Sequence, residues 1–304
     1  MSILNDPTLH RFLTSHSNHR ADHSVAVFDC DGTVIKGDIG EAMLFHQIEH
    51  FHFRVSPAEV WDDHPHREKL GQLFDSLARA EPSQRQRHSS FEPFAEMILS
   101  WYFGQIGEGK VEKACGDVVR LLAGFTPAEV RAIAEQTFLS EISIPLSERK
   151  LGSHTRPRGI RYIAETVQVL RKLQELNFDL WVVSGSCRWS VESVFRRIGV
   201  PNERVIGIDL LEADGVYRPK LVEPVPIREK KIDSLRIHER NVPLLVASDS
   251  RNDVPLLQYA SEVKLFVNSR RKQSSEFFSL SNLRRDASWV VIERPTYLES
   301  VPNG

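Results

Sequence analysis

Apolar runs and helical periodicity alternate along the second half of the chain. Short apolar runs, typical of buried strands, occur at residues 178–183, 205–208, 242–247, 263–267 and 290–292. Between them, apolar positions recur every three or four residues and predict helices at 160–176, 190–198 and 254–260. Asp214-Gly215 predicts a hairpin turn between two further short strands. This alternation is typical of a parallel sheet with helices on both faces.

The first half of the chain has a different pattern. Residues 24–28 form one apolar run that predicts a buried strand, and the spacing of apolar residues then predicts a helix over 39–52. Helical periodicity continues to about residue 150, with a helix start at Thr126-Pro127-Ala128-Glu129 and no predicted strand. Residues 152–159 are rich in Gly, Pro and polar residues, which predicts a linker.

These patterns together predict an α/β fold in which the first strand is separated from the rest of its sheet. We expect a doubly wound, Rossmann-like parallel sheet in a core domain made of residues 1–36 and 157–304. Residues 37–156 would then be an inserted α-helical cap domain.

Composition narrows the class of protein. Hydrophobic residues make up 41% of the 304 residues, which is enough for a packed core. The net charge of −2 argues against a polyanion-binding surface, so no nucleic-acid partner is expected. Three cysteines form no disulfide framework, and neither a secretory leader nor a bilayer-spanning segment is visible. We therefore expect a cytoplasmic protein that does not act on membranes.

The strand at 24–28 leads directly into Asp29-Cys30-Asp31-Gly32-Thr33. Both carboxylates would project from the end of this strand, which is where ligands bind in open α/β sheets. One carboxylate can attack a substrate while the other transfers a proton, and both can hold a divalent cation.

Two further segments supply groups suited to phosphate binding. Ser184 and Gly185 follow the strand at 178–183, so a hydroxyl and a closely approaching backbone amide would meet a phosphoryl oxygen there. Lys231 lies at a predicted helix start and could neutralise a phosphoryl oxygen. We prefer it to Lys230 because Leu235, four residues later, would anchor the same helix face to the core.

A second pair of acidic residues follows the strand at 242–247. Asp249 at the strand end is placed to ligate a cation held by Asp29, and Asp253 could support the same site from the next helix. The alternative interpretation of this segment is a helix N-cap followed by an acidic first turn.

The order of these four motifs resembles that of the haloacid dehalogenase-like superfamily. The resemblance implies that Asp29 is a nucleophile that forms an aspartyl-phosphate and that Asp31 is the acid and base. It also implies Mg²⁺ held by Asp29, Asp249 and the Asp31 backbone carbonyl, with Asp253 in support, and phosphoryl binding by Ser184, Gly185 and Lys231. The chain departs from the family pattern at Ser248 and Ser250, where glycine is usual.

The helical insertion resembles the phosphoserine phosphatase-like branch, and Arg161 to Val225 is also similar to phosphorylcholine phosphatases. The resemblance implies a small phosphorylated metabolite as substrate. Phosphoserine and phosphocholine, the substrates of these two groups of phosphatases, both carry a cationic nitrogen. We therefore expect Asp38 or Glu41 to contact a substrate cation. Cap aromatics could add a cation–π cage, although the same spacing is typical of a helical core; they are Phe45, Trp61, Phe94, Trp101 and Tyr102.

Three alternatives compete with a Mg²⁺-dependent phosphatase. A phosphotransferase of the same fold would pass the phosphoryl group to an acceptor other than water. A calcium-binding loop starting at Asp29 is disfavoured because its sixth position is Val34 and its twelfth is Gly40. Zinc binding by His46 and His50, one helical turn apart, lacks an accompanying cysteine cluster.

Overall fold

The computed structural model describes residues 2–17, 24–269 and 286–299. Its central element is a six-stranded sheet in the order β12-β11-β10-β1-β6-β7, and all neighbouring strands are parallel. The predicted α/β class is therefore confirmed. The strands are β1 (Val25–Phe28), β6 (Asp179–Cys187), β7 (Val205–Ile208), β10 (Leu245–Ser248), β11 (Val263–Val267) and β12 (Trp289–Ile292).

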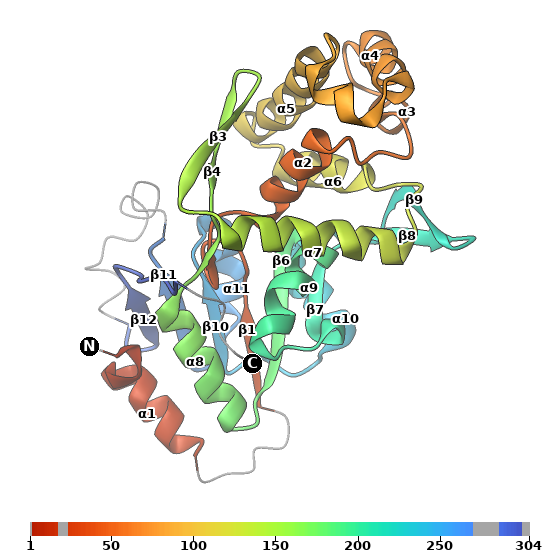
Figure 1. The fold of residues 1–304 in the computed structure, drawn as a ribbon. Coiled ribbons are helices and arrows are strands. Elements are labelled where there is room, and N and C mark those ends of the chain that lie inside the picture. Colours follow the sequence, from red (N-terminus) through yellow and green to blue (C-terminus); the bar gives the residue numbers. More distant parts are fainter. Residues whose placement is uncertain (1, 18–23, 270–285, 300–304) are drawn as a thin grey trace.

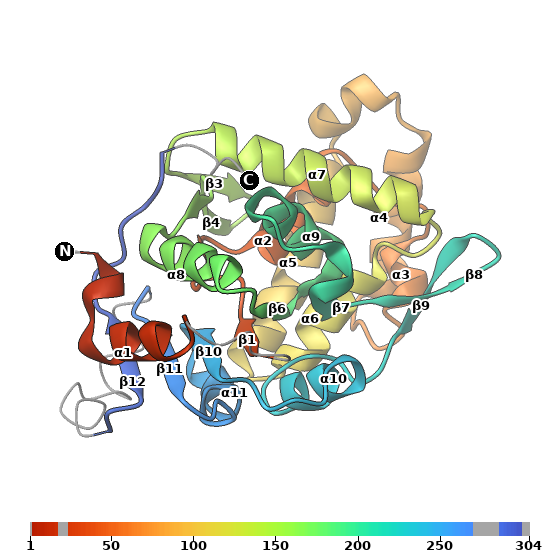
Figure 2. The ribbon, with the colours of Figure 1, turned by 90° about the horizontal axis from the view of Figure 1, so that it is seen from below.

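Helices cover both faces of this sheet, as Figure 2 shows. The alternating side chains of β1 explain why, because successive residues of a strand point to opposite faces. Ala26 and Phe28 pack with α1 (Pro7–Ser15), α8 (Ala164–Glu175) and α9 (Arg188–Phe195). Val25 and Val27 pack with α10 (Lys230–His238) and α11 (Val254–Gln258) on the other face. Both faces of the sheet are thus apolar and buried.

The inserted helices are α2 (Ile39–Glu49), α3 (Pro57–Val60), α4 (Arg67–Arg79), α5 (Phe91–Gly107), α6 (Val111–Arg120) and α7 (Pro127–Ser143). Helices α2 to α6 contribute to an apolar cluster of their own and lie above α7 in Figure 1. The buried side chains of α7 instead pack against the core, in particular against α9. The predicted start of α7 is confirmed, since Thr126 and Glu129 form a reciprocal capping box. Short 3₁₀ turns lie at Ile3–Asn5, Pro82–Arg87, Arg196–Ile198, Asn202–Arg204 and Arg251–Asp253.

Strands also occur where the sequence predicted none. The predicted linker at 152–159 is wrong, because β3 (Ser147–Leu151) and β4 (His154–Arg158) form an antiparallel hairpin. The predicted helix at 160–176 starts only at Ala164, because β5 (Arg161–Tyr162) pairs with β2 (Ile35–Lys36) where the chain enters and leaves the insertion. The hairpin at Asp214-Gly215 is confirmed by β8 (Leu210–Ala213) and β9 (Val216–Leu221).

Within the residues described, no helix is both long and apolar enough to cross a membrane.

Three histidines of the insertion lie against one another, with ring centroids 4.3 Å apart for His46 and His50 and 5.4 Å for His46 and His52. Burial, with smaller contributions from the neighbouring histidines, lowers the pKa of His46 to about 3 and that of His52 to about 4. His46 and His52 therefore stay uncharged at neutral pH.

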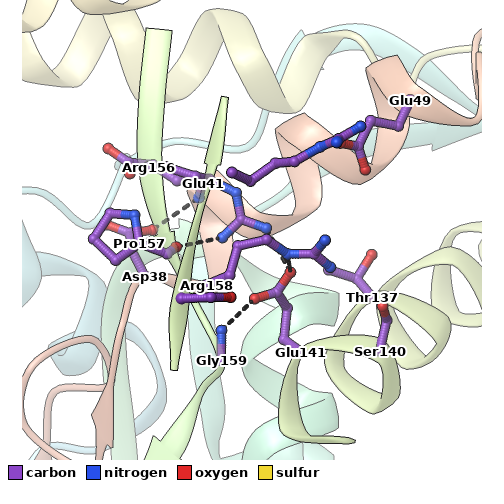
Figure 3. Close-up of polar contacts among 12 residues, drawn as sticks. Asp38, Glu41, Glu49, Thr137, Ser140, Glu141, Arg156, Pro157, Arg158 and Gly159 are labelled. Atoms are coloured by element: carbon purple, nitrogen blue, oxygen red, sulfur yellow. Dashed lines mark hydrogen bonds and ion pairs between the residues drawn. The ribbon is translucent and has the colours of Figure 1, made fainter. Parts of the chain in front are cut away.

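A buried carboxylate explains how the polar β3–β4 hairpin is anchored (Figure 3). Glu141 of α7 accepts hydrogen bonds from Arg156 Nη2 at 2.5 Å, Arg158 Nε at 2.9 Å and the Gly159 backbone N at 3.0 Å. Arg156 is itself buried and lies over the Phe45 ring. The hairpin is thus held by charge and hydrogen bonding, which apolar periodicity does not reveal.

Replacing this carboxylate should destabilise the protein strongly. Glu141→Ala leaves Arg156 buried without its counterion, and breaking such a pair typically costs about 3–5 kcal/mol. Urea unfolding monitored by circular dichroism measures the loss. The exposed Glu148→Ala on β3 is the matched control and should change the free energy of unfolding by less than about 0.5 kcal/mol. Equal stability of the two variants would contradict this account of the hairpin.

Candidate active site

Four segments that are distant in sequence meet beneath the cap at the carboxyl ends of β1, β6 and β10. They enclose a cavity of about 350 Å³. Its core-side lining contains every residue that the motifs predicted for catalysis, metal binding or phosphate binding: Asp29, Asp31, Ser184, Gly185, Lys231, Asp249 and Asp253. Parallel strands bring their carboxyl ends to one edge, which explains this convergence.

Lys231 is the cation at the centre of the site. Its Nζ lies 2.9 Å from Asp29 Oδ1 and 2.7 Å from Asp253 Oδ2, and its side chain is almost fully buried. Lys230 instead extends to Glu112 on α6, and Leu235 is buried against the sheet. The geometry therefore agrees with the preference for Lys231.

Burial and neighbouring charges together set the pKa values of these groups. Burial alone would lower the pKa of Lys231, but Asp253 and Asp29 raise it overall, so the lysine is charged. For Asp29, burial raises the pKa and the Lys231 charge opposes the rise without cancelling it. Burial and the nearby Asp38 raise the pKa of Asp31 well above its usual range, which favours a protonated carboxyl there.

The two carboxyls of the first motif have different hydrogen-bond partners. Asp29 Oδ2 accepts a bond from Thr33 Oγ1 at 3.3 Å. Asp31 Oδ1 accepts from the Ile39 backbone N at 2.8 Å, and Asp31 Oδ2 accepts from Ser186 Oγ at 2.6 Å. Asp29 is thus paired with a cation, while Asp31 is held by neutral donors.

The last motif divides into two roles. Asp253 Oδ2 accepts from Ser248 Oγ at 2.7 Å as well as from Lys231, so this carboxylate orients the lysine. Asp249 Oδ2 accepts from Ser269 Oγ at 2.8 Å and lies against Gly32. A Cβ at Gly32 would come within 2.0 Å of that oxygen, and Gly32 has a φ of +77°, so both space and backbone conformation require glycine.

The donor set of this edge suits a hard divalent cation. The carboxylates of Asp29 and Asp249 face the same cavity. Among the described residues that line it, four acidic side chains are buried, whereas the buried cation Lys231 pairs only with Asp29 and Asp253. Within the described residues, no group of three or more His, Cys, Asp or Glu side chains is arranged to hold a metal ion. Mg²⁺ fits this arrangement, because it is commonly bound by one or two carboxylates while retaining water or substrate oxygens.

Ser184 and Gly185 lie within the last four residues of β6, which extends beyond its predicted end at residue 183 to Cys187. Ser184 Oγ accepts a bond from the Ser186 backbone N at 3.1 Å, and this bond does not use the hydroxyl hydrogen of Ser184. Gly185 lies against Ile227, where a Cβ would come within 3.4 Å of the isoleucine side chain. Both residues line the cavity.

Asp38 and Glu41 line the cap side of the cavity. Asp38 caps α2 by accepting a hydrogen bond from the Glu41 backbone N at 2.8 Å, so it also has a structural role. Glu41 Oε1 accepts from Tyr102 Oη at 3.4 Å. Of the two interpretations of the cap aromatics, the structure supports the helical core: Phe45, Trp61 and Phe94 are buried in the cap core, and only Tyr102 of the five lines the cavity.

Sequence reasoning missed the hydroxyls that orient the charged groups. Thr33 and Ser186 lie inside motifs that were recognised, but serine and threonine in turns give no distinctive signal. Ser248 was considered only as a small residue replacing glycine, whereas its hydroxyl bonds Asp253. Such a role depends on which side chains face one another, across two strand ends for Ser186 and across a local turn for Thr33 and Ser248.

Comparisons with known proteins agree with this geometry. Residues 26–258 match the family described as haloacid dehalogenase-like hydrolase. No curated protein matches the chain. A functionally unknown protein from Anaerococcus prevotii DSM 20548 superposes with a TM-score of 0.72 at 19% identity, covering 92% of this chain and 89% of that one.

Two further solved structures give lower scores. A protein of unknown function from Bordetella pertussis Tohama I has a TM-score of 0.56 at 18% identity, covering 89% of this chain and 98% of that one. A substrate-bound phosphoserine phosphatase has a TM-score of 0.46 at 12% identity, covering 90% and 95%. The first two similarities support the fold, and the family match extends over most of the sequence. The chain belongs to the haloacid dehalogenase-like hydrolases.

Proposed function

We propose that this protein is a Mg²⁺-dependent phosphatase that hydrolyses a small phosphomonoester through a phosphorylated Asp29. The observation that carries the proposal is the buried Lys231, held between Asp29 and Asp253 at the floor of the cavity. A carboxylate beside a fixed cation can approach the phosphorus of an anionic phosphoryl group. Phosphoryl transfer depends mainly on such positioning and charge neutralisation.

Each residue then has a defined role. Asp29 attacks phosphorus, and the bond between phosphorus and the ester oxygen breaks as that oxygen takes a proton from Asp31. Asp31, now a carboxylate, removes a proton from water as the water oxygen bonds to phosphorus and the bond to Asp29 breaks. Lys231, Ser184 and the Gly185 amide hold the phosphoryl oxygens. The raised pKa of Asp31 favours its starting role as an acid.

Asp29, Asp249 and the backbone carbonyl of Asp31 would hold Mg²⁺, while Asp253 supports the site by orienting Lys231. When bound, the metal would supply positive charge against the transferred phosphoryl group. The excess of buried carboxylates over buried cations at this edge supports that assignment.

The cap side of the cavity indicates the kind of leaving group. Its wall consists mainly of apolar side chains: Met43, Leu44, Ile106, Val111, Val118, Val119 and Leu122. The charged side chains that the cap contributes to this lining are Asp38 and Glu41. An alkyl phosphate with a cationic nitrogen would therefore be accepted more readily than one with a carboxylate and no cationic nitrogen, and a substrate such as phosphoserine or phosphocholine is the class we propose.

Removing the nucleophile or the metal should abolish activity. Phosphate release would be measured from phosphoserine, phosphocholine and a matched series of aminoalkyl, hydroxyalkyl and carboxyalkyl phosphates. We expect Asp29→Asn and an excess of chelator each to reduce release by at least about 1000-fold. The aminoalkyl compound should have the highest kcat/KM of the matched series, and the carboxyalkyl compound the lowest.

The same assay separates the alternatives. Release that survives Asp29→Asn would contradict the nucleophile assignment, and the highest kcat/KM for the carboxyalkyl compound would contradict the proposed substrate class. Transfer of phosphate to added alcohols, with little free phosphate formed, would identify a phosphotransferase instead.

The two adjacent lysines provide a matched pair of variants. Lys231→Gln removes the buried cation and should lower kcat/KM by about 100- to 1000-fold, as loss of one preorganised charge-stabilising donor does in other enzymes. Lys230→Gln removes only the contact with Glu112 and should stay within about twofold of the wild type. Steady-state kinetics on folded protein, checked by circular dichroism, measures both, and similar losses in the two variants would exclude the assigned role of Lys231.

A further inference from the structure

Asp31 accepts hydrogen bonds from both the core and the cap. The Ile39 backbone N, in the first turn of α2, donates to Oδ1 at 2.8 Å. Ser186 Oγ, at the end of β6, donates to Oδ2 at 2.6 Å. Each oxygen of the carboxyl thus has one donor, and the two bonds together fix its rotation about the Cβ–Cγ bond.

Ser186 is itself held in place on two sides. Its backbone N donates to Ser184 Oγ at 3.1 Å, which fixes the turn that carries it. On its other side lies Gly40 of α2, where a Cβ would come within 2.7 Å of Ser186 Oγ. The Ser186 hydroxyl therefore occupies a narrow space between the core strand and the first turn of the cap helix. It lines the same cavity as Asp29 and Lys231.

Both donors can keep their bonds to Asp31 through the proton transfer. An N–H or O–H group can donate to a carboxyl oxygen whether that carboxyl is protonated or ionised. While the Ser186 hydroxyl donates to Oδ2, the acidic proton on that oxygen is directed elsewhere, toward the ester oxygen of a bound substrate. The Ile39 amide holds Oδ1 in the same way.

We propose that Ser186 is a positioning residue that orients the Asp31 carboxyl for proton transfer to the leaving group. The inference rests on the proposed function, since it assigns Asp31 the role of acid. In the first step the Oδ2 proton passes to the ester oxygen as its bond to phosphorus breaks, and the Ser186 hydroxyl then donates to the new carboxylate. Without Ser186, Asp31 would keep the Ile39 amide as its donor and could rotate away from the substrate.

The test compares two leaving groups in one variant. p-Nitrophenolate leaves readily without a proton, whereas the alkoxide of benzyl phosphate requires one. In rapid-quench single turnovers with Mg²⁺, Ser186→Ala should slow cleavage of benzyl phosphate about tenfold and that of p-nitrophenyl phosphate less than twofold. Ser186→Thr keeps the hydroxyl and should recover most of the benzyl phosphate rate.

The control is Ser193→Ala, which removes a buried serine hydroxyl that donates to the Ser190 carbonyl within α9. It should slow neither substrate. Rate constants rather than amplitudes are compared, so a partly unfolded preparation does not imitate the effect. Equal slowing of both substrates by Ser186→Ala, or rates like those of the wild type, would overturn the inference.

Failure of the proposed function gives a different result. If Asp31→Asn cleaves benzyl phosphate as fast as the wild type, Asp31 is not the acid and the proposed function itself is wrong at this step. If Asp31→Asn is slow and Ser186→Ala is unchanged, only the role assigned to Ser186 fails.

Discussion

A buried lysine between two aspartates is the constraint on which the rest of the site depends. Burying Lys231 alone would be costly, so Asp29 and Asp253 must both lie within hydrogen-bond distance of its Nζ. This requirement brings together the end of β1, the start of α10 and the segment after β10. Ser248 completes the arrangement by bonding Asp253 from the last position of β10. The ion pairs thus define the cavity floor against which a phosphoryl group would lie.

The cap is connected to this floor through hydrogen bonding at the Asp31 carboxyl as well as through packing. Asp31 takes one hydrogen bond from the first turn of α2 and one from the end of β6. Where the chain returns to the core, Glu141 holds the arginines of the β3–β4 hairpin, and β5 then pairs with β2. The position of the cap helix and the orientation of the Asp31 carboxyl are therefore linked through short, direct contacts.

The sequence was sufficient to predict the parallel sheet and the carboxylates at its edge, because apolar runs and strand-end positions are local signals. It also favoured Lys231 over Lys230, since Leu235 marks the buried helix face. The β3–β4 hairpin was missed because its strands are polar and are stabilised by Glu141 from another element. The hydroxyls of Ser186 and Ser248 were missed for the same reason. Ser186 bonds Asp31, which lies 155 residues away at the end of another strand. Ser248 bonds Asp253, which lies five residues away across a turn.

The central claim is that Asp29 itself carries the phosphoryl group during turnover. It is tested most directly by quenching the reacting enzyme in acid and analysing the peptide that contains Asp29 by mass spectrometry. The account predicts one added phosphoryl group on that peptide in the wild type and none in Asp29→Asn. A phosphoryl group found on another side chain of the active wild-type enzyme would contradict it.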